Sequence, residues 1–118
     1  MERPARHFLG QRATVVIDRP LGSRHPRFPD LVYPVNYGYV PDCPAPDGED
    51  QDAYVLGVAE PLAEFIGVCV AVIHRLDDVE DKLVVAPKGV SFMAAEIRAA
   101  TDFQERYFRS VLLFPSGA

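Results

Sequence analysis

The chain has 118 residues, 48% of them hydrophobic, and a formal net charge of −5, which is typical of one globular domain spanning residues 1–118. The negative charge argues against a nucleic-acid-binding protein, which needs clustered Lys and Arg. The sequence holds no apolar run long enough to cross a bilayer, and Met1 is not followed by the apolar segment of a secretory signal. We therefore expect no membrane association and a cytoplasmic location, with Cys43 and Cys69 as free thiols.

The N-terminal third predicts one strand and a basic loop. Residues 1–12 show no clear period and are expected to form an irregular arm, whereas residues 13–18 are β-branched and predict a strand that ends on Asp18. Three prolines and a glycine make residues 19–30 a loop. Its basic side chains are Arg19, Arg24, His25 and Arg27. Alone, such a loop is best explained by solvation; beside a metal site, its arginines could bind phosphate oxygens through their bidentate fork.

Residues 33–52 carry the most distinctive polar pattern of the chain. The sequence Tyr-Pro-Val-Asn-Tyr-Gly-Tyr is followed, after a proline-containing loop, by Asp-Gly-Glu-Asp-Gln-Asp. Residues 33–40 predict a short strand that leads into the acidic part. A tyrosine is more often an amphipathic core residue than a catalytic one. Three tyrosines and an asparagine within seven residues nevertheless favour at least one polar contact with a site.

The acidic end of this segment predicts a cation site. Asp47 and Glu49 are two residues apart and point to the same side of an extended segment, and Asp52 can join them if the chain bends near Gly48. Converging carboxylates cost free energy unless a cation lies among them. Because no Cys or His is interleaved, a hard cation such as Mg²⁺ or Mn²⁺ is favoured over zinc.

The middle of the chain predicts further strands around a second acidic run. The predicted strands are residues 53–58, 65–76 and 83–86. The acidic run at 77–82 would, alone, be an exposed hairpin, but two acidic clusters in one small domain favour a shared site. If the last strand begins near Glu80, then Glu80 and Lys82 lie on one face and Asp81 lies on the other.

The C-terminal segment predicts an amphipathic helix. Ser91 is a suitable N-cap, and apolar residues recur every three or four positions from there to about Arg109. Most of this stripe is expected in the core, while Tyr107 could present its hydroxyl at the edge of the site. The apolar tail at 111–114 is expected to pack against the domain or to join a subunit interface.

The segments at 33–39 and 47–52, together with Asp77 and the Glu-Asp-Lys sequence at 80–82, resemble the signature of the soluble inorganic pyrophosphatases of family I. The resemblance runs over about residues 14–107. It implies an α+β fold that is mainly β: a small, twisted, five-stranded OB-like barrel with a C-terminal helix. It also implies a homo-oligomeric enzyme that uses Mg²⁺ or Mn²⁺ to hydrolyse inorganic pyrophosphate to two phosphates.

The same resemblance implies roles for the matching residues. The implied metal ligands are four carboxylates, Asp47, Asp52, Asp77 and Glu80. Glu49 stands where the family has the Asp that helps to deprotonate the attacking water, and the implied catalytic group is Glu49, Asp47 and Tyr37. The implied phosphate-binding residues are Tyr37, Lys82 and Tyr107, with Arg24 and Arg27 as stand-ins for basic residues of a family hairpin. Asp18 matches a Glu at the end of a strand near the site.

The chain departs from the family pattern in several places. Glu49 and Glu80 replace Asp, Phe108 stands where the family usually has a phosphate-binding Lys, and the loop before Tyr33 is shorter. Two alternatives therefore stay open. One is a catalytically weak protein that binds metal and phosphate in a regulatory or scaffolding role, and the other is a hydrolase of a larger organic pyrophosphate that the shorter loop admits. Oligonucleotide binding on the barrel is disfavoured by the net charge.

Overall fold

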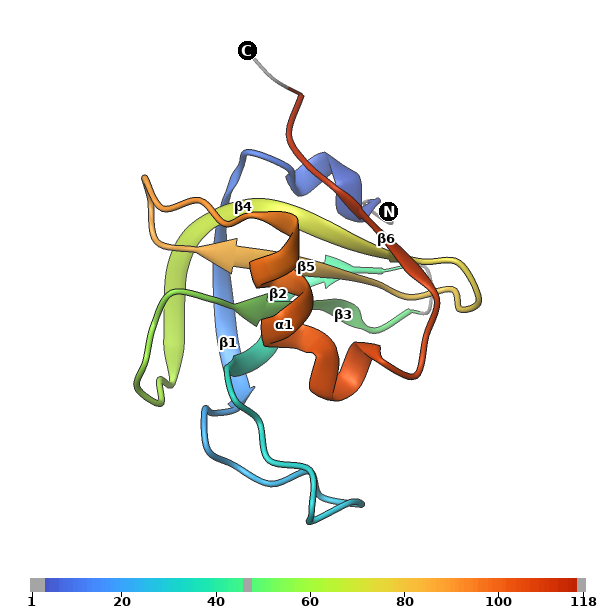
Figure 1. Cartoon of the computed structure of the whole chain (residues 1–118). Helices are drawn as coiled ribbons and strands as arrows, with labels where there is room; N and C mark the ends of the chain where they lie inside the picture. Colours follow the sequence, from blue (N-terminus) through green and yellow to red (C-terminus); the bar gives the residue numbers. More distant parts are fainter. Residues whose placement is uncertain (1–3, 46–47, 117–118) are drawn as a thin grey trace.

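The computed structural model describes residues 4–45 and 48–116, which form a small β-barrel with one face covered by a helix (Figure 1). The elements in chain order are η1 (Ala5–Phe8), β1 (Arg12–Arg19), β2 (Asn36–Pro44), β3 (Asp50–Val55), β4 (Glu64–Arg75), β5 (Asp81–Ala86), α1 (Ala94–Glu105) and β6 (Ser110–Leu113). None of the helices in the described residues is long and apolar enough to cross a membrane.

In the described residues, five strands close the barrel in the order β1-β2-β3-β5-β4, because β4 also pairs with β1. The pairings are antiparallel except that between β3 and β5. The 12-residue strand β4 makes the closure possible (Figure 1). One of its edges bonds to β1 at its start and to β6 at its end, while its other edge bonds to β5. The expected fold, mainly β with a five-stranded barrel and a C-terminal helix, is confirmed.

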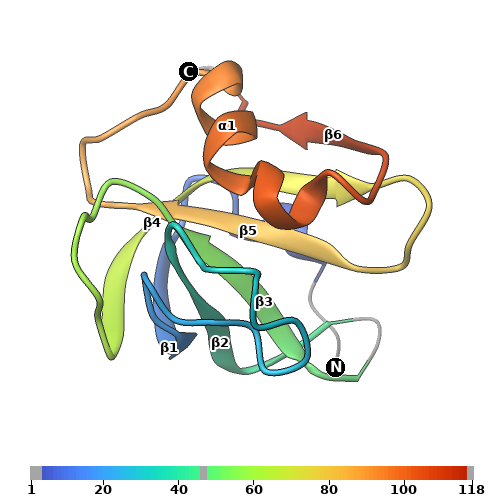
Figure 2. The same cartoon turned by 60° about the horizontal axis from the view of Figure 1, so that its bottom comes forward.

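Two apolar clusters hold this fold together, one made by side chains inside the barrel and one that includes Ile97 of α1. Figure 2 shows α1 lying over β4 and β5. Alternate residues of a strand point to opposite faces. Leu83 and Val85 of β5 accordingly lie in the barrel cluster, while Val84 lies in the cluster that contains Ile97 of α1. Both faces of β5 are therefore buried, which explains why this strand reads as a continuous apolar run. Strands β2, β3, β4 and β5 each contribute side chains to both clusters.

The N-terminal segment differs from the irregular arm expected for residues 1–12. The 3₁₀ helix η1 packs Ala5 and Phe8 against the barrel core, and β1 already begins at Arg12. Two buried side chains in one short turn are too few to create a detectable period. The expected strand at 13–18 is confirmed by β1.

The ends of other elements also differ from the prediction. Helix α1 has Met93, not Ser91, as its N-cap, and the Glu96 carboxylate accepts the backbone N–H of Met93 at 2.8 Å. The helix ends at Glu105 rather than near Arg109. The apolar tail packs on the domain as expected, because β6 pairs with β4.

Candidate active site

A cavity of about 550 Å³ lies where the barrel strands meet the C-terminal end of α1 and the loop that follows β1. Every barrel strand contributes at least one polar side chain to its wall. The acidic, basic and phenolic residues of this wall are Asp18, Asp52, Glu80, Arg19, His25, Arg75, Lys82, Tyr33, Tyr37 and Tyr107. The cavity therefore collects groups of both signs together with hydroxyl donors, a surface suited to a small charged ligand.

Lys82 is the most buried cation of this wall, with 3% of its surface exposed. Its Nζ donates to Asp52 Oδ2 at 2.6 Å and to Glu80 Oε2 at 2.9 Å. Burial alone would favour the neutral amine, but the oxygens of Tyr37, Asp52 and Glu80 outweigh it and raise the pKa of Lys82. A permanent positive charge thus faces the cavity.

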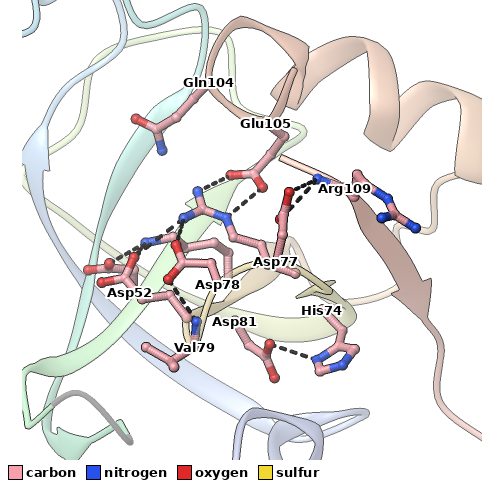
Figure 3. Close-up of polar contacts among 12 residues, drawn as sticks. Asp52, His74, Asp77, Asp78, Val79, Asp81, Gln104, Glu105 and Arg109 are labelled. Atoms are coloured by element: carbon pink, nitrogen blue, oxygen red, sulfur yellow. Dashed lines mark hydrogen bonds and ion pairs between the residues drawn. The ribbon is translucent and has the colours of Figure 1, made fainter. Parts of the chain in front are cut away.

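The alternation predicted around Lys82 is confirmed. Glu80 and Lys82 lie on the cavity side, while the Asp81 carboxylate lies on the opposite side, 2.9 Å from Nδ1 of His74 (Figure 3). This arrangement follows directly from the period of two in a strand.

Arg75 forms a second buried cation at the end of β4. Its guanidinium makes two parallel hydrogen bonds with Glu105, from Nε at 3.0 Å and from Nη2 at 2.7 Å. Nη1 also donates to Asp78 at 3.0 Å and to Glu80 at 3.4 Å, and the guanidinium carbon lies 3.6 Å from the centre of the Phe108 ring. Burial opposes the charge, but Glu105 outweighs it and raises the pKa of Arg75. Glu80 therefore bridges the two buried cations of the site.

Arg75 and Glu105 were not identified from the sequence, although each leaves a signal there. Arg75 is a charged residue at the end of a long apolar strand. Glu105 follows Ile97 and Thr101 at intervals of four, so it lies on the buried stripe of α1. A carboxylate on a buried stripe predicts a cationic partner, because an unpaired buried charge is costly.

Tyr33 and Tyr37 are neutral hydrogen-bonding groups of the site, because burial raises the pKa of both phenols. Burial raises the pKa of Tyr37, so its phenol keeps its proton at physiological pH. The hydroxyl of Tyr33 accepts a hydrogen bond from Arg19 Nη1 at 3.0 Å and donates to Gln104 at 3.2 Å. The hydrogen bond to Tyr33 thus holds the Arg19 side chain at the cavity wall.

Asn36, in the same sequence segment, has a structural role. It is fully buried, and its side-chain oxygen accepts the backbone N–H groups of Leu21 and Leu62 at 2.9 and 3.1 Å. Its side-chain nitrogen donates to the backbone oxygen of Glu60 at 2.9 Å. Asn36 thus fastens two loops to the start of β2.

A smaller cavity of about 300 Å³ adjoins the first and is strongly acidic. Its wall consists of Asp18, Tyr39, Glu49, Asp50 and Asp52. Asp18 and Asp52 line both cavities, so the acidic cavity opens beside the one that holds the buried cations. Partial burial of the carboxyl, together with the charge of Asp52, raises the pKa of Asp18 despite the opposing effect of Arg19.

The donor chemistry of the acidic cavity fits a hard divalent cation, because its polar lining consists of oxygen donors. Within residues 4–45 and 48–116, no three side chains of His, Cys, Asp and Glu are grouped closely enough to hold a metal ion. Asp47, an expected ligand next to Glu49 in the sequence, lies outside the described residues. The acidic cavity therefore offers the type of ligand atom that a hard cation prefers, while the described side chains are not arranged around one point.

The structure brings together most, but not all, of the residues expected at the site. The large cavity is lined by Asp18, Tyr37, Asp52, Glu80, Lys82 and Tyr107, and the acidic cavity by Asp18, Glu49 and Asp52. Asp77 lines neither of them: its carboxylate accepts the backbone N–H of Arg109 at 3.1 and 3.2 Å (Figure 3).

The expected loop arginines also lie away from both cavities. Arg24 and Arg27 are exposed, and Nη1 of Arg24 donates to the backbone oxygen of Pro29 at 2.7 Å. Of the basic residues in the expected loop at 19–30, Arg19, which the structure places at the end of β1, and His25 reach the large cavity. A loop without a regular period gave no means of choosing among these four side chains.

Comparisons with known proteins identify the fold. No family model and no curated protein matches the chain. The structure is similar to an inorganic pyrophosphatase from Ehrlichia chaffeensis, with a TM-score of 0.67 and 17% identity over 87% of this chain and 85% of that one. It is also similar to the inorganic pyrophosphatase of Neisseria gonorrhoeae, with a TM-score of 0.64 and 21% identity over 83% of this chain and 74% of that one. For the inorganic pyrophosphatase of Helicobacter pylori the TM-score is 0.62, with 20% identity over 86% and 83%. The chain therefore has the fold of these proteins.

Proposed function

We propose that the chain hydrolyses inorganic pyrophosphate to two phosphates in a reaction that depends on Mg²⁺ or Mn²⁺. The observation that carries this proposal is the junction of two cavities, one lined by the cations Arg19, Arg75 and Lys82 and the other by carboxylates. Such a pair of cavities suits an anion and a hard cation side by side. The likeness of the fold to solved inorganic pyrophosphatases supports the same substrate.

Of the expected ligands, Asp52 lines the acidic cavity, beside the carboxylates of Asp18, Glu49 and Asp50, and Asp47 stays an expected ligand. Because no three of the described carboxylates are grouped closely enough to hold a metal ion, these side chains would have to move towards one another around the cation. A bound divalent cation would lower the pKa of water and neutralise charge on the phosphates. Glu80 and Asp77, the other expected ligands, could join only by exchanging existing bonds, Glu80 with its two buried cations and Asp77 with the Arg109 amide.

The chain's own residues would act on the substrate from the large cavity. Lys82 stays charged and would bind a phosphate oxygen, and the neutral phenol of Tyr37 would donate to another. We place Arg19, at the end of β1, on the substrate in place of the loop residues Arg24 and Arg27, because Arg19 lines the cavity. Tyr107 lies at the outer edge of the same wall.

Glu49 would accept the proton that the attacking water loses. As the water oxygen bonds to one phosphorus, the bridging P–O bond breaks and the second phosphate leaves. Glu49 lines the acidic cavity, which adjoins the phosphate-binding wall, so a water held by the cation there would lie beside its carboxylate.

The test is steady-state phosphate release from inorganic pyrophosphate with Mg²⁺. A positioned general base contributes about 10²–10⁴ in rate, so Glu49→Gln should lower kcat by that factor while Glu49→Asp retains most of it. Asp102→Asn, an exposed carboxylate on α1, is the matched control and should leave kcat unchanged. Equal rates for wild type and Glu49→Gln would remove Glu49 from this role.

A second candidate function is a binding protein without efficient turnover. It is favoured by the pairing of Asp52 and Glu80 with Lys82, since these carboxylates already have an internal cation. Such a protein would bind metal and phosphate in a regulatory or scaffolding role. Calorimetry that shows Mg²⁺-linked pyrophosphate binding, with no phosphate release, would favour it over the hydrolase.

A further inference from the structure

A further hollow of about 490 Å³ opens beside the large cavity. Its wall consists of Phe28, Asp30, Leu31 and Tyr107. Phe28, Leu31 and Tyr107 also line the large cavity, so the two hollows meet along these three side chains. The volume is in the range of pockets that hold small organic molecules, about 300–1,000 Å³. A ligand anchored in the large cavity could therefore extend into this one.

The chemistry of this hollow does not suit a bare inorganic ion. Phe28 and Tyr107 are 62% and 71% exposed, and they come from segments far apart in the sequence. Two exposed aromatic side chains at one hollow offer flat apolar faces to a planar ring. Asp30 adds an exposed carboxylate, which can accept hydrogen bonds from hydroxyl groups. Inorganic pyrophosphate is small and charged, so it would gain nothing from the apolar ring faces of Phe28 and Tyr107 or from the carboxylate of Asp30.

We infer that the site takes a nucleoside diphosphate, with its diphosphate in the large cavity and its base against Phe28 and Tyr107. The diphosphate would meet Arg19, Tyr37 and Lys82, and Asp30 would accept the ribose hydroxyls. A nucleobase is favoured over an isoprenoid chain because a base is planar and its sugar carries the hydroxyls that a carboxylate can bind.

This inference rests on the proposed function, because the bond to be hydrolysed is the same phosphoanhydride. The water oxygen would bond to the terminal phosphorus and the bridging P–O bond would break. The products are phosphate and a nucleoside monophosphate, and Glu49 would take the proton of the water. The aromatic hollow changes the class of substrate that the site would take, and the reaction stays the same.

The test measures binding without turnover. The affinity of the α,β-methylene analogue of ADP, which resists hydrolysis, is compared by calorimetry in the presence of Mg²⁺ with that of inorganic methylenediphosphonate. Stacking of one base on aromatic side chains is expected to make the ADP analogue bind about 10-fold tighter or more. Phe28→Ala should abolish this preference and leave the affinity for methylenediphosphonate unchanged. Phe114→Ala, another exposed aromatic residue, should change neither affinity.

Each other result of this experiment contradicts the inference. Equal affinities of the two ligands in wild type, or an equal loss of both in Phe28→Ala, would show that the hollow does not recognise a base. If geranyl diphosphate binds more tightly than the ADP analogue, the hollow recognises an apolar chain and not a nucleobase. If Phe28→Ala does not fold, Asp30→Ala should still weaken the ADP analogue selectively.

The two proposals fail in different ways. Preferential binding of the ADP analogue without release of phosphate from pyrophosphate would overturn the hydrolase and leave the nucleotide site standing. Release of phosphate from pyrophosphate with no preference for the ADP analogue would overturn the nucleotide site alone.

Discussion

Lys82 is the residue on which the electrostatics of the candidate site depend. It is buried, it holds two carboxylates within 3 Å of its Nζ, and its pKa is raised by them after burial has opposed the charge. A buried ammonium is tolerated only when it is paired in this way. The same charge that keeps Asp52 and Glu80 in place is available to a phosphate oxygen.

Replacing Lys82 therefore tests whether this charge acts on the substrate. Lys82→Met should lower kcat/KM for pyrophosphate by about 10²–10³, the effect of removing one preorganised charge-stabilising group. Lys88→Met is the matched control, because Lys88 is exposed and lies outside the site, and its kinetics should equal those of wild type. Unchanged kinetics in Lys82→Met would reduce Lys82 to a structural residue.

The two cysteines differ in burial, and their reactivity tests that difference. Burial raises the pKa of the Cys69 thiol to about 11, whereas Cys43 is only partly buried, and both are free thiols as expected. Because the native state favours the neutral thiol, the stabilisation from this group is complete below the unfolded pKa of about 8.5 and is lost as the pH rises towards 11.

At pH 8 a thiol-specific reagent should consequently label Cys43 in the native protein and Cys69 only after unfolding. The Cys43→Ser variant should show almost no labelling until urea is added. Rapid labelling of Cys43→Ser under native conditions would contradict the burial of Cys69.

At the scale of elements, the attachment of α1 to the barrel depends on a buried ion pair. Arg75 and Glu105 are 4% and 5% exposed in their side chains, and Tyr54 donates to the same Glu105 carboxylate at 2.6 Å. Burial, with the charge of Glu105, raises the pKa of Tyr54 well above its ordinary value, so its hydroxyl remains a donor. The helix end, the strand end and the core tyrosine thus form one connected network.

Breaking this pair should destabilise the whole fold. Arg75→Met leaves Glu105 buried without its partner and should lower the free energy of unfolding by about 3–5 kcal/mol. Arg106→Met, which removes the exposed pair with Asp102, should cost less than about 1 kcal/mol. Urea unfolding of the two variants makes the comparison, and similar losses would contradict the structural weight given to Arg75.

The strands and the helix were predictable from local patterns, and the connections between them were not. Alternation placed Lys82 of β5 and Glu80, just before that strand, on one side without any knowledge of the fold. The pair of Arg75 with Glu105 joins residues 30 positions apart, and no period in the sequence links them. Loop residues escaped prediction for a similar reason: nothing local distinguishes Arg19 from Arg24, or shows that Asp77 bonds to the backbone of Arg109.

At the scale of the whole molecule, a homo-oligomer stays a prediction. Strand β6 pairs with β4, and Val111 in β6 and Phe114 directly after it are 40% and 44% exposed. Exposed apolar side chains next to a strand edge are typical of interfaces between copies of a chain. Sedimentation velocity measures the mass of the species in solution, and we expect a species larger than one chain. A monomer at every concentration would contradict this expectation.

The fold and the two joined cavities support one central claim, that divalent cations and pyrophosphate meet in this barrel and react there. The most direct test is the initial rate of phosphate release from inorganic pyrophosphate as the Mg²⁺ concentration rises from zero, with EDTA as the starting point. We expect a rate at background in EDTA that increases with Mg²⁺ to a plateau, and an Asp52→Asn variant whose plateau is lower by about 10² or more, because a site carboxylate is lost. A wild-type rate that is no higher than that of Asp52→Asn at every Mg²⁺ concentration would contradict the claim.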